Sequence, residues 1–133
     1  MISNATPLIC LSKMNQLNLL KELFKKITIT TTVRDEVLVK DKEGYTLIEQ
    51  AILGGWIKIQ DPKNEINFEI DKGENTSINL ARELKDKLIL DDSRGIRIAK
   101  SLNITYMRTI SIILLALQKK LLNKKQTSIK KTS

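Results

Sequence analysis

Residues 87–102 read KLILDDSRGIRIAKSL, and this stretch decides the fold class. The apolar run at 88–90 predicts a buried strand, and the pattern from Gly95 to Leu102 predicts a helix. Asp91 and Asp92 stand between the two. A buried strand that passes into a helix is typical of an α/β protein with a parallel sheet. Ligands of such sheets bind outside the carboxyl ends of the strands, so the aspartate pair lies on the side where sites are built.

The same alternation of strands and helices extends along the rest of the chain. Further strands are predicted at residues 1–3, 26–31, 56–59 and 104–107. Helices are predicted at 6–13, 17–24, from Thr32 or a neighbouring cap to Val39, at 45–53 before Gly54 and Gly55, from Asp71 to Leu84, and from Ile110 to Leu122. Ile78, Ala81 and Leu84 are expected to face inward. The pattern therefore predicts a three-layer α/β/α sandwich with a central parallel β-sheet.

The composition excludes several kinds of chemistry. Hydrophobic residues make up 41% and charged residues 29%, as in a soluble globular protein. There is no histidine, so histidine acid–base catalysis and histidine zinc sites are excluded. The single cysteine, Cys10, rules out an intramolecular disulfide and suits a small core residue in a cytoplasmic protein. A catalytic metal ion would therefore have oxygen ligands, which indicates Mg²⁺ or Mn²⁺.

The positive charge is concentrated at the C-terminus. Residues 118–133 carry six lysines and no acidic residue, which leaves +2 of the net +8 on residues 1–117. We expect one domain over residues 1–117, followed by the end of the last helix and a basic, disordered tail that favours phosphate backbones. The N-terminal apolar run lacks a basic leader, and residues 110–117 are too short to cross a bilayer, so no membrane association is expected.

Polar residues that follow predicted strands form a candidate site. They are Asn4, Glu36, Glu74, Asp91 and Asp92. Each falls after a strand or near the start of a helix, so the fold could gather them in one acidic cleft. Crowded carboxylates repel each other without a cation, and Mg²⁺ takes a few carboxylates while it keeps several waters. An ion held in this way can activate water and stabilise charge on a phosphodiester.

Each of these residues also has a structural interpretation. Glu74, Glu36 and its neighbour Asp35 could complement helix dipoles, and for Asp35 this interpretation is favoured. One aspartate of the 91–92 pair is expected to cap the following helix. Asn4 could be a turn residue.

Several motifs resemble those of the PIN domain family. ISNATPLICLSKMNQLNLLKELF (2–24) resembles the start of the VapC-like subgroup that opens with a serine, an aspartate or asparagine and then SPLI or TPLI. VRDEVL (33–38), GWIKI (55–59), DKGENTSINLA (71–81) and LILDDSRGIRIAKSLNI (88–104) resemble the later motifs in order. This resemblance covers about residues 1–117. It implies an α/β/α fold and a Mg²⁺- or Mn²⁺-dependent ribonuclease, often the toxin of a toxin–antitoxin pair.

The resemblance also implies roles for individual residues. Glu36, Glu74, Asp91 and Asp92 would be catalytic, and Asn4, Glu74, Asp91 and Asp92 would hold the metal ion, with Asp92 as the inward ligand. Thr6, which falls where the family often has a serine, and Arg94, Arg97 and Arg108 would contact the RNA. An antitoxin is implied as partner, and a homodimer is left open.

The sequence departs from the family pattern at two places. Asn4 stands where catalytic members of the wider family carry aspartate, and an amide brings no negative charge to a metal ion. In YMRTISIILL (106–115), Arg108 and Ser111 stand at positions that are usually glycine. These departures motivate a second hypothesis, a degenerate PIN domain that binds RNA or a protein without cutting. A phosphoacceptor receiver domain is disfavoured, because receivers carry their acidic pair at the first strand.

Overall fold

The fold was analysed in a computed structural model, which describes residues 1–39 and 44–120. Five short strands form one sheet: β1 (Ile2–Ser3), β2 (Ile27–Ile29), β3 (Ile57–Ile59), β4 (Leu88–Ile89) and β5 (Tyr106–Met107). Their order is β3-β2-β1-β4-β5, and every pairing is parallel. The predicted central parallel sheet is therefore confirmed.

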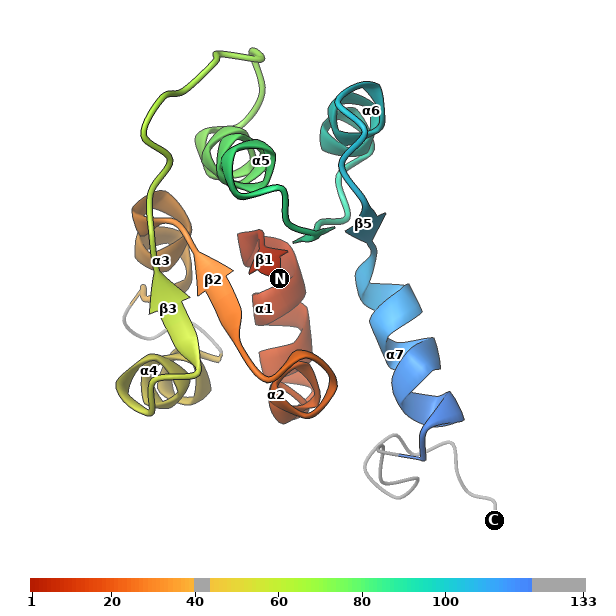
Figure 1. Ribbon diagram of the computed structural model, residues 1–133. Coiled ribbons are helices and arrows are strands. Elements are labelled where there is room, and N and C mark those ends of the chain that lie inside the picture. The colour runs from red at the N-terminus through yellow and green to blue at the C-terminus, as the bar shows by residue number, and fades with distance from the viewer. Residues whose placement is uncertain (40–43, 121–133) are drawn as a thin grey trace.

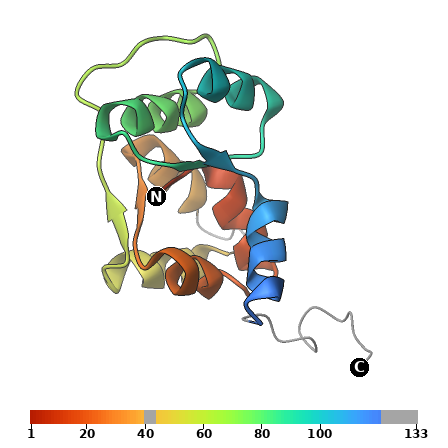
Figure 2. The same cartoon turned by 45° about the vertical axis from the view of Figure 1, so that its right-hand side comes forward.

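Helices connect the strands and cover both faces of the sheet (Figures 1 and 2). They are α1 (Ala5–Lys13), α2 (Asn18–Phe24), α3 (Thr31–Val37), α4 (Tyr45–Leu53), α5 (Lys72–Leu84), α6 (Ser93–Ser101) and α7 (Thr109–Gln118). Parallel strands need crossover connections of this kind, since a tight hairpin can join only antiparallel strands. The result is the expected α/β/α sandwich.

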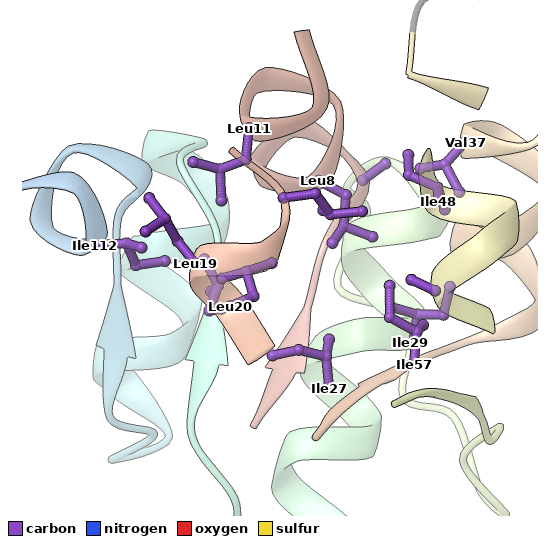
Figure 3. Close-up of a cluster of buried hydrophobic side chains, with 14 of the residues drawn as sticks. Leu8, Leu11, Leu19, Leu20, Ile27, Ile29, Val37, Ile48, Ile57 and Ile112 are labelled. Atoms are coloured by element: carbon purple, nitrogen blue, oxygen red, sulfur yellow. The ribbon is translucent and has the colours of Figure 1, made fainter. Parts of the chain in front are cut away.

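Two hydrophobic clusters hold the layers together. The larger lies under α1, α2, α3, α4 and α7 and receives Ile27, Ile29, Ile57 and Ile89 from the sheet; Figure 3 shows much of it. The smaller lies under α5 and α6 and receives Ile2, Leu88 and Leu90. Successive residues of β4 thus point to opposite faces, as the two-residue period of a strand requires. Both faces of the sheet carry side chains into these clusters, which is why most strand residues are apolar; Lys58 on the edge strand β3 is exposed.

Several predicted boundaries differ from the structure. Helix α3 is capped by Thr30, two residues before Thr32, and ends at Val37 rather than Val39. Helix α7 ends at Gln118; the predicted extension through Leu122 reaches residues outside the described part of the chain, as does the basic tail beyond Lys120. Leu84 was predicted to face inward, but 43% of it is exposed because it lies in the last turn of α5, past the cluster filled by Ile78 and Ala81. Within residues 1–39 and 44–120, no helix has the length and apolarity needed to cross a bilayer.

Candidate active site

The strand order creates a switch point between β1 and β4. The chain adds β2 and β3 on one side of β1 and places β4 and β5 on the other. The connections that leave the carboxyl ends of β1 and β4 therefore diverge, and this is where open α/β sheets bind ligands. Asn4 follows β1, and Asp91 and Asp92 come shortly after β4. The backbone N–H of Asn4 donates to the carbonyl of Ile89 at 2.9 Å, so the sheet itself fixes Asn4 at this edge.

Asn4 has an unusual side chain. It is the N-cap residue of α1, yet its side chain makes no capping hydrogen bond. Only 4% of the residue is exposed, and its Oδ1 atom is buried without a hydrogen-bond partner in the described part of the chain. A buried acceptor without a hydrogen bond lowers the stability of the folded state. An oxygen of this kind fits a cation that would supply the missing interaction.

Glu74 and Asp92 face each other across the starts of α5 and α6. Asp92 caps α6, because its Oδ2 accepts from the N–H of Gly95 at 3.0 Å. This bond is the main reason that the pKa of Asp92 is lowered. Burial, followed by a hydrogen bond with Asp92 and the charges of Asp92, Asp71 and Glu36, raises the pKa of Glu74 to about 7. One proton is therefore held between two carboxyl groups near neutral pH.

Glu36 reaches this pair from α3. A side chain at Gly73 would overlap the Glu36 Oε1 atom, so the glycine is what allows the carboxylate to lie against the first turn of α5. The charge of Glu36 is felt at Glu74, one residue further along the chain from Gly73. The structure thus brings Glu36, Glu74 and Asp92 together, and the register places Asn4 at the same edge.

Asp91 is directed elsewhere. Its Oδ1 accepts from the N–H of Thr109 at 2.8 Å, and its Oδ2 accepts from the Thr109 hydroxyl at 2.6 Å. The Arg108 guanidinium donates to the Asp91 carbonyl at 3.2 Å. The Asp91 carboxylate therefore secures the first turn of α7, whereas its neighbour Asp92 faces Glu74. The predicted cap of α6 by one member of the pair is confirmed, and that member is Asp92.

The four predicted RNA-contacting residues differ in their exposure and in their hydrogen bonds. Thr6 is exposed in the first turn of α1, and Arg97 is exposed on α6. Arg94 donates to the carbonyl of Glu69 at 3.0 Å. Arg108 donates to the carbonyl of Asp91 at 3.2 Å, and the charge of Arg94 is felt at Asp92. The arginines at this end of the sheet are partly engaged with backbone carbonyls and retain further donors.

The oxygen donors of this site are of the kind that a hard divalent cation prefers, but they are not spaced as a complete set of ligands. Within residues 1–39 and 44–120, no three acidic groups stand where they could ligate one ion together. The donor set consists of carboxylate oxygens and one orphaned amide oxygen, which suits Mg²⁺ or Mn²⁺. Burial, and after it the neighbouring carboxylates, raise the pKa of Glu74, and a bound cation would oppose both effects.

Three residues of this region were missed by the sequence analysis. Thr30 and Thr76 join α3 to α5 through their hydroxyls, and Asp71 caps α5 beside Glu74. Thr30 directly follows β2, but the predicted strand at 26–31 contained it, so the rule that selected Asn4 did not reach it. Nothing in the sequence marks Thr76, because its role depends on which helix lies against α5.

A parallel α/β/α sandwich with acidic side chains at its switch point is the arrangement expected of a PIN domain. The chain belongs to this family: the family model DUF3368, a PIN domain, matches residues 1–132. Members of the superfamily are generally nucleases and typically depend on divalent metal ions.

A solved structure supports the fold independently. A PilT N-terminus domain protein from the hyperthermophilic archaeon Sulfolobus solfataricus P2 superimposes with a TM-score of 0.60 at 18% sequence identity. The match covers 89% of this chain and 95% of that one. A comparison with curated protein sequences gives no significant match.

Proposed function

We propose that the protein is a Mg²⁺- or Mn²⁺-dependent endoribonuclease that acts as the toxin of a toxin–antitoxin system. The observation that carries the nuclease part is the gathering of Glu36, Glu74 and Asp92 beside the buried, unpaired Oδ1 of Asn4 at the switch point. The toxin role, a cytoplasmic location and an antitoxin partner are supported by the motif resemblance of residues 2–24 and 71–104.

In this proposal the position of each residue determines whether it holds the metal ion, supports the site or contacts the RNA. Glu74, Asp92 and Asn4 would hold the metal ion beside the charge of Glu36, and the ion would supply an activated water and neutralise charge on the phosphodiester. Glu74 must release its proton to bind the ion, since its pKa is about 7 in the metal-free site. Asp91 would hold the first turn of α7 in place through its bonds with Thr109 and Arg108. Arg94, Arg97 and Arg108 would contact phosphates, and Thr6 would face the same edge.

Cleavage of single-stranded RNA in the presence of Mn²⁺ or Mg²⁺ tests this proposal. Asp92→Asn is expected to reduce the rate at least about 100-fold, because it removes a ligand charge and still leaves an oxygen to cap α6. Asp35→Asn is the matched control: Asp35 neighbours Glu36 on α3, but it is exposed and bonded to Arg34. Cleavage that survives a chelator, or that Asp92→Asn leaves unchanged, contradicts the metal-dependent mechanism.

The alternative is a PIN domain that binds RNA or a protein without cutting. The neutral amide at Asn4 favours it, because the site then has one negative charge fewer for the ion. Titration with Mn²⁺ by calorimetry discriminates the two. A saturable response at the wild-type site supports the enzyme, whereas no response in the wild type and a response in Asn4→Asp supports the degenerate domain.

A further inference from the structure

Two buried threonine hydroxyls connect the helices that carry Glu36 and Glu74. Thr30 Oγ1 and Thr76 Oγ1 are 2.8 Å apart, and the residues are 46 positions apart in the chain. Thr30 is fully buried and only 4% of Thr76 is exposed. Thr30 caps α3, and Thr76 lies near the start of α5; these helices are side by side in Figures 1 and 2.

The direction of this hydrogen bond follows from counting protons. Each hydroxyl carries one proton. Thr76 donates its proton to the carbonyl of Gly73 at 3.0 Å, so Thr30 must donate its own to Thr76. Thr30 Oγ1 in turn accepts from the N–H of Val33 at 3.2 Å. The four groups form one directed chain from the first turn of α3 to the first turn of α5.

Both ends of this chain of hydrogen bonds lie next to the acidic site. At the α5 end it reaches Gly73, the residue against which Glu36 packs and which precedes Glu74. At the other end it caps α3, the helix that carries Glu36. The register of β1 and β2 also places Thr30 level with Asn4 at the carboxyl edge of the sheet. A shift between α3 and α5 would therefore separate Glu36 from Glu74.

We propose that the Thr30–Thr76 hydrogen bond is a positioning device for the acidic site, which sets the placement of Glu36 against the start of α5 and thereby the affinity for a divalent cation. The inference rests on the proposed function, because the affinity matters only if the site takes a metal ion. Neither threonine carries a charge or is itself proposed as a ligand. Groups that orient metal ligands in this way are typically worth 10- to 100-fold in metal affinity.

Calorimetric titration of the full chain with Mn²⁺ alone tests this inference. Thr76→Val keeps the shape of the side chain and removes both of its hydrogen bonds, and the double variant Thr30→Val/Thr76→Val replaces the polar pair by an apolar one. Both are expected to bind Mn²⁺ about 10-fold more weakly. Thr76→Ser retains the hydroxyl and is expected to restore wild-type affinity. The double variant leaves no unpaired hydroxyl at position 30, but it also removes the cap that accepts from the N–H of Val33, so it should be no more stable than the single variant.

Ser77→Ala is the matched control. The Ser77 hydroxyl is fully buried in the same turn and donates to the same Gly73 carbonyl at 2.8 Å, but this bond lies within α5. It should lower stability in urea while Mn²⁺ affinity stays at the wild-type value. Equal Mn²⁺ affinities in the wild type and in both valine variants overturn this inference and leave the proposed function standing. A loss of Mn²⁺ affinity in Ser77→Ala equal to that in Thr76→Val does the same. A wild-type chain without a saturable response overturns the proposed metal dependence, and this inference with it.

Discussion

Glu74 differs from its neighbours because burial and three nearby carboxylates all raise its pKa, from the usual 4.5 to about 7. Between these two values the folded state holds a proton that the unfolded state has already released. The contribution of Glu74 to stability is therefore fully present below about pH 4.5 and is lost as the pH rises through 7. The metal-free protein is held together better when this one carboxyl group is neutral.

Glu74→Gln should remove this part of the pH dependence, because glutamine resembles the protonated acid. In the presence of chelator, the variant should gain roughly 1–2 kcal/mol relative to the wild type between pH 5 and pH 8, after allowance for solvent screening. Urea unfolding at the two pH values measures the difference. If the wild-type and variant stabilities change in parallel with pH, Glu74 does not carry the raised pKa.

Asp91 and Asp92 are adjacent but serve different helices, which gives a second prediction for single residues. Asp91→Ala removes both hydrogen bonds to Thr109 and leaves the first turn of α7 without that acceptor. We expect a loss of about 1–2 kcal/mol in the free energy of unfolding, measured in urea. Hydrogen exchange should quicken at the start of α7 and remain unchanged in α6. Faster exchange at the start of α6 instead would contradict this prediction, because it would show that Asp91 stabilises α6 and not α7.

At the scale of elements, α5 organises an irregular segment as well as the acidic site. Asn75, Asn79 and Glu83 recur every four residues on one face of α5 and bind backbone groups of residues 63–68. Asn79 is fully buried; its Oδ1 accepts from Ile66 N–H at 2.8 Å, and its Nδ2 donates to the Ile66 carbonyl at 2.9 Å. The helix side chains thus provide the hydrogen bonds that a neighbouring strand would otherwise give.

Asn79→Ala should therefore be severely destabilising. It removes both hydrogen bonds of the fully buried Asn79 side chain to the backbone of Ile66, and we expect a loss of about 2–3 kcal/mol in urea unfolding. Asn64→Ala is the control, because Asn64 is exposed in the same segment and binds Glu83 through its backbone N–H. Its effect should stay within about 0.5 kcal/mol. Equal effects of the two substitutions would argue against the role given to Asn79.

For the whole molecule, the charge is divided between a nearly balanced body and a basic C-terminus. The last sixteen residues contribute +6 of the net +8, although most of them lie outside the described residues. A basic segment of this kind binds phosphates without regard to sequence, and each neutralised phosphate makes binding more sensitive to salt. We therefore expect the tail to govern the affinity for RNA and the acidic site to govern cleavage.

Replacement of Lys124, Lys125, Lys130 and Lys131 by glutamine tests this division. The slope of log affinity against log salt for single-stranded RNA should become shallower by up to about 3, and the cleavage positions should not change. Fluorescence anisotropy at several KCl concentrations gives the slope. An unchanged slope would mean that the tail does not contact the RNA.

Most of the fold could be predicted from the sequence because its signals are local. The β-branched run before Thr31, the pair Gly54–Gly55 after α4 and the passage from Leu88 to Asp92 each mark an element by nearby residues. Errors concerned the ends of elements, such as the strand predicted at 26–31 and the helix end predicted at Val39, and the burial of Leu84, which depends on what lies opposite. The candidate site was identified for the same local reason, since its polar residues follow strands.

By itself, the sequence determined the alternation of strands and helices, the choice of oxygen donors and the approximate edge where they gather. Only the tertiary structure decided that β1 lies between β2 and β4, that Asp92 faces Glu74 while Asp91 holds Thr109, and that Thr30 meets Thr76. The physical reason is that periodicity and capping act over a few residues, whereas these contacts join residues 17 or more positions apart. Such contacts exist only after the helices have packed on the sheet.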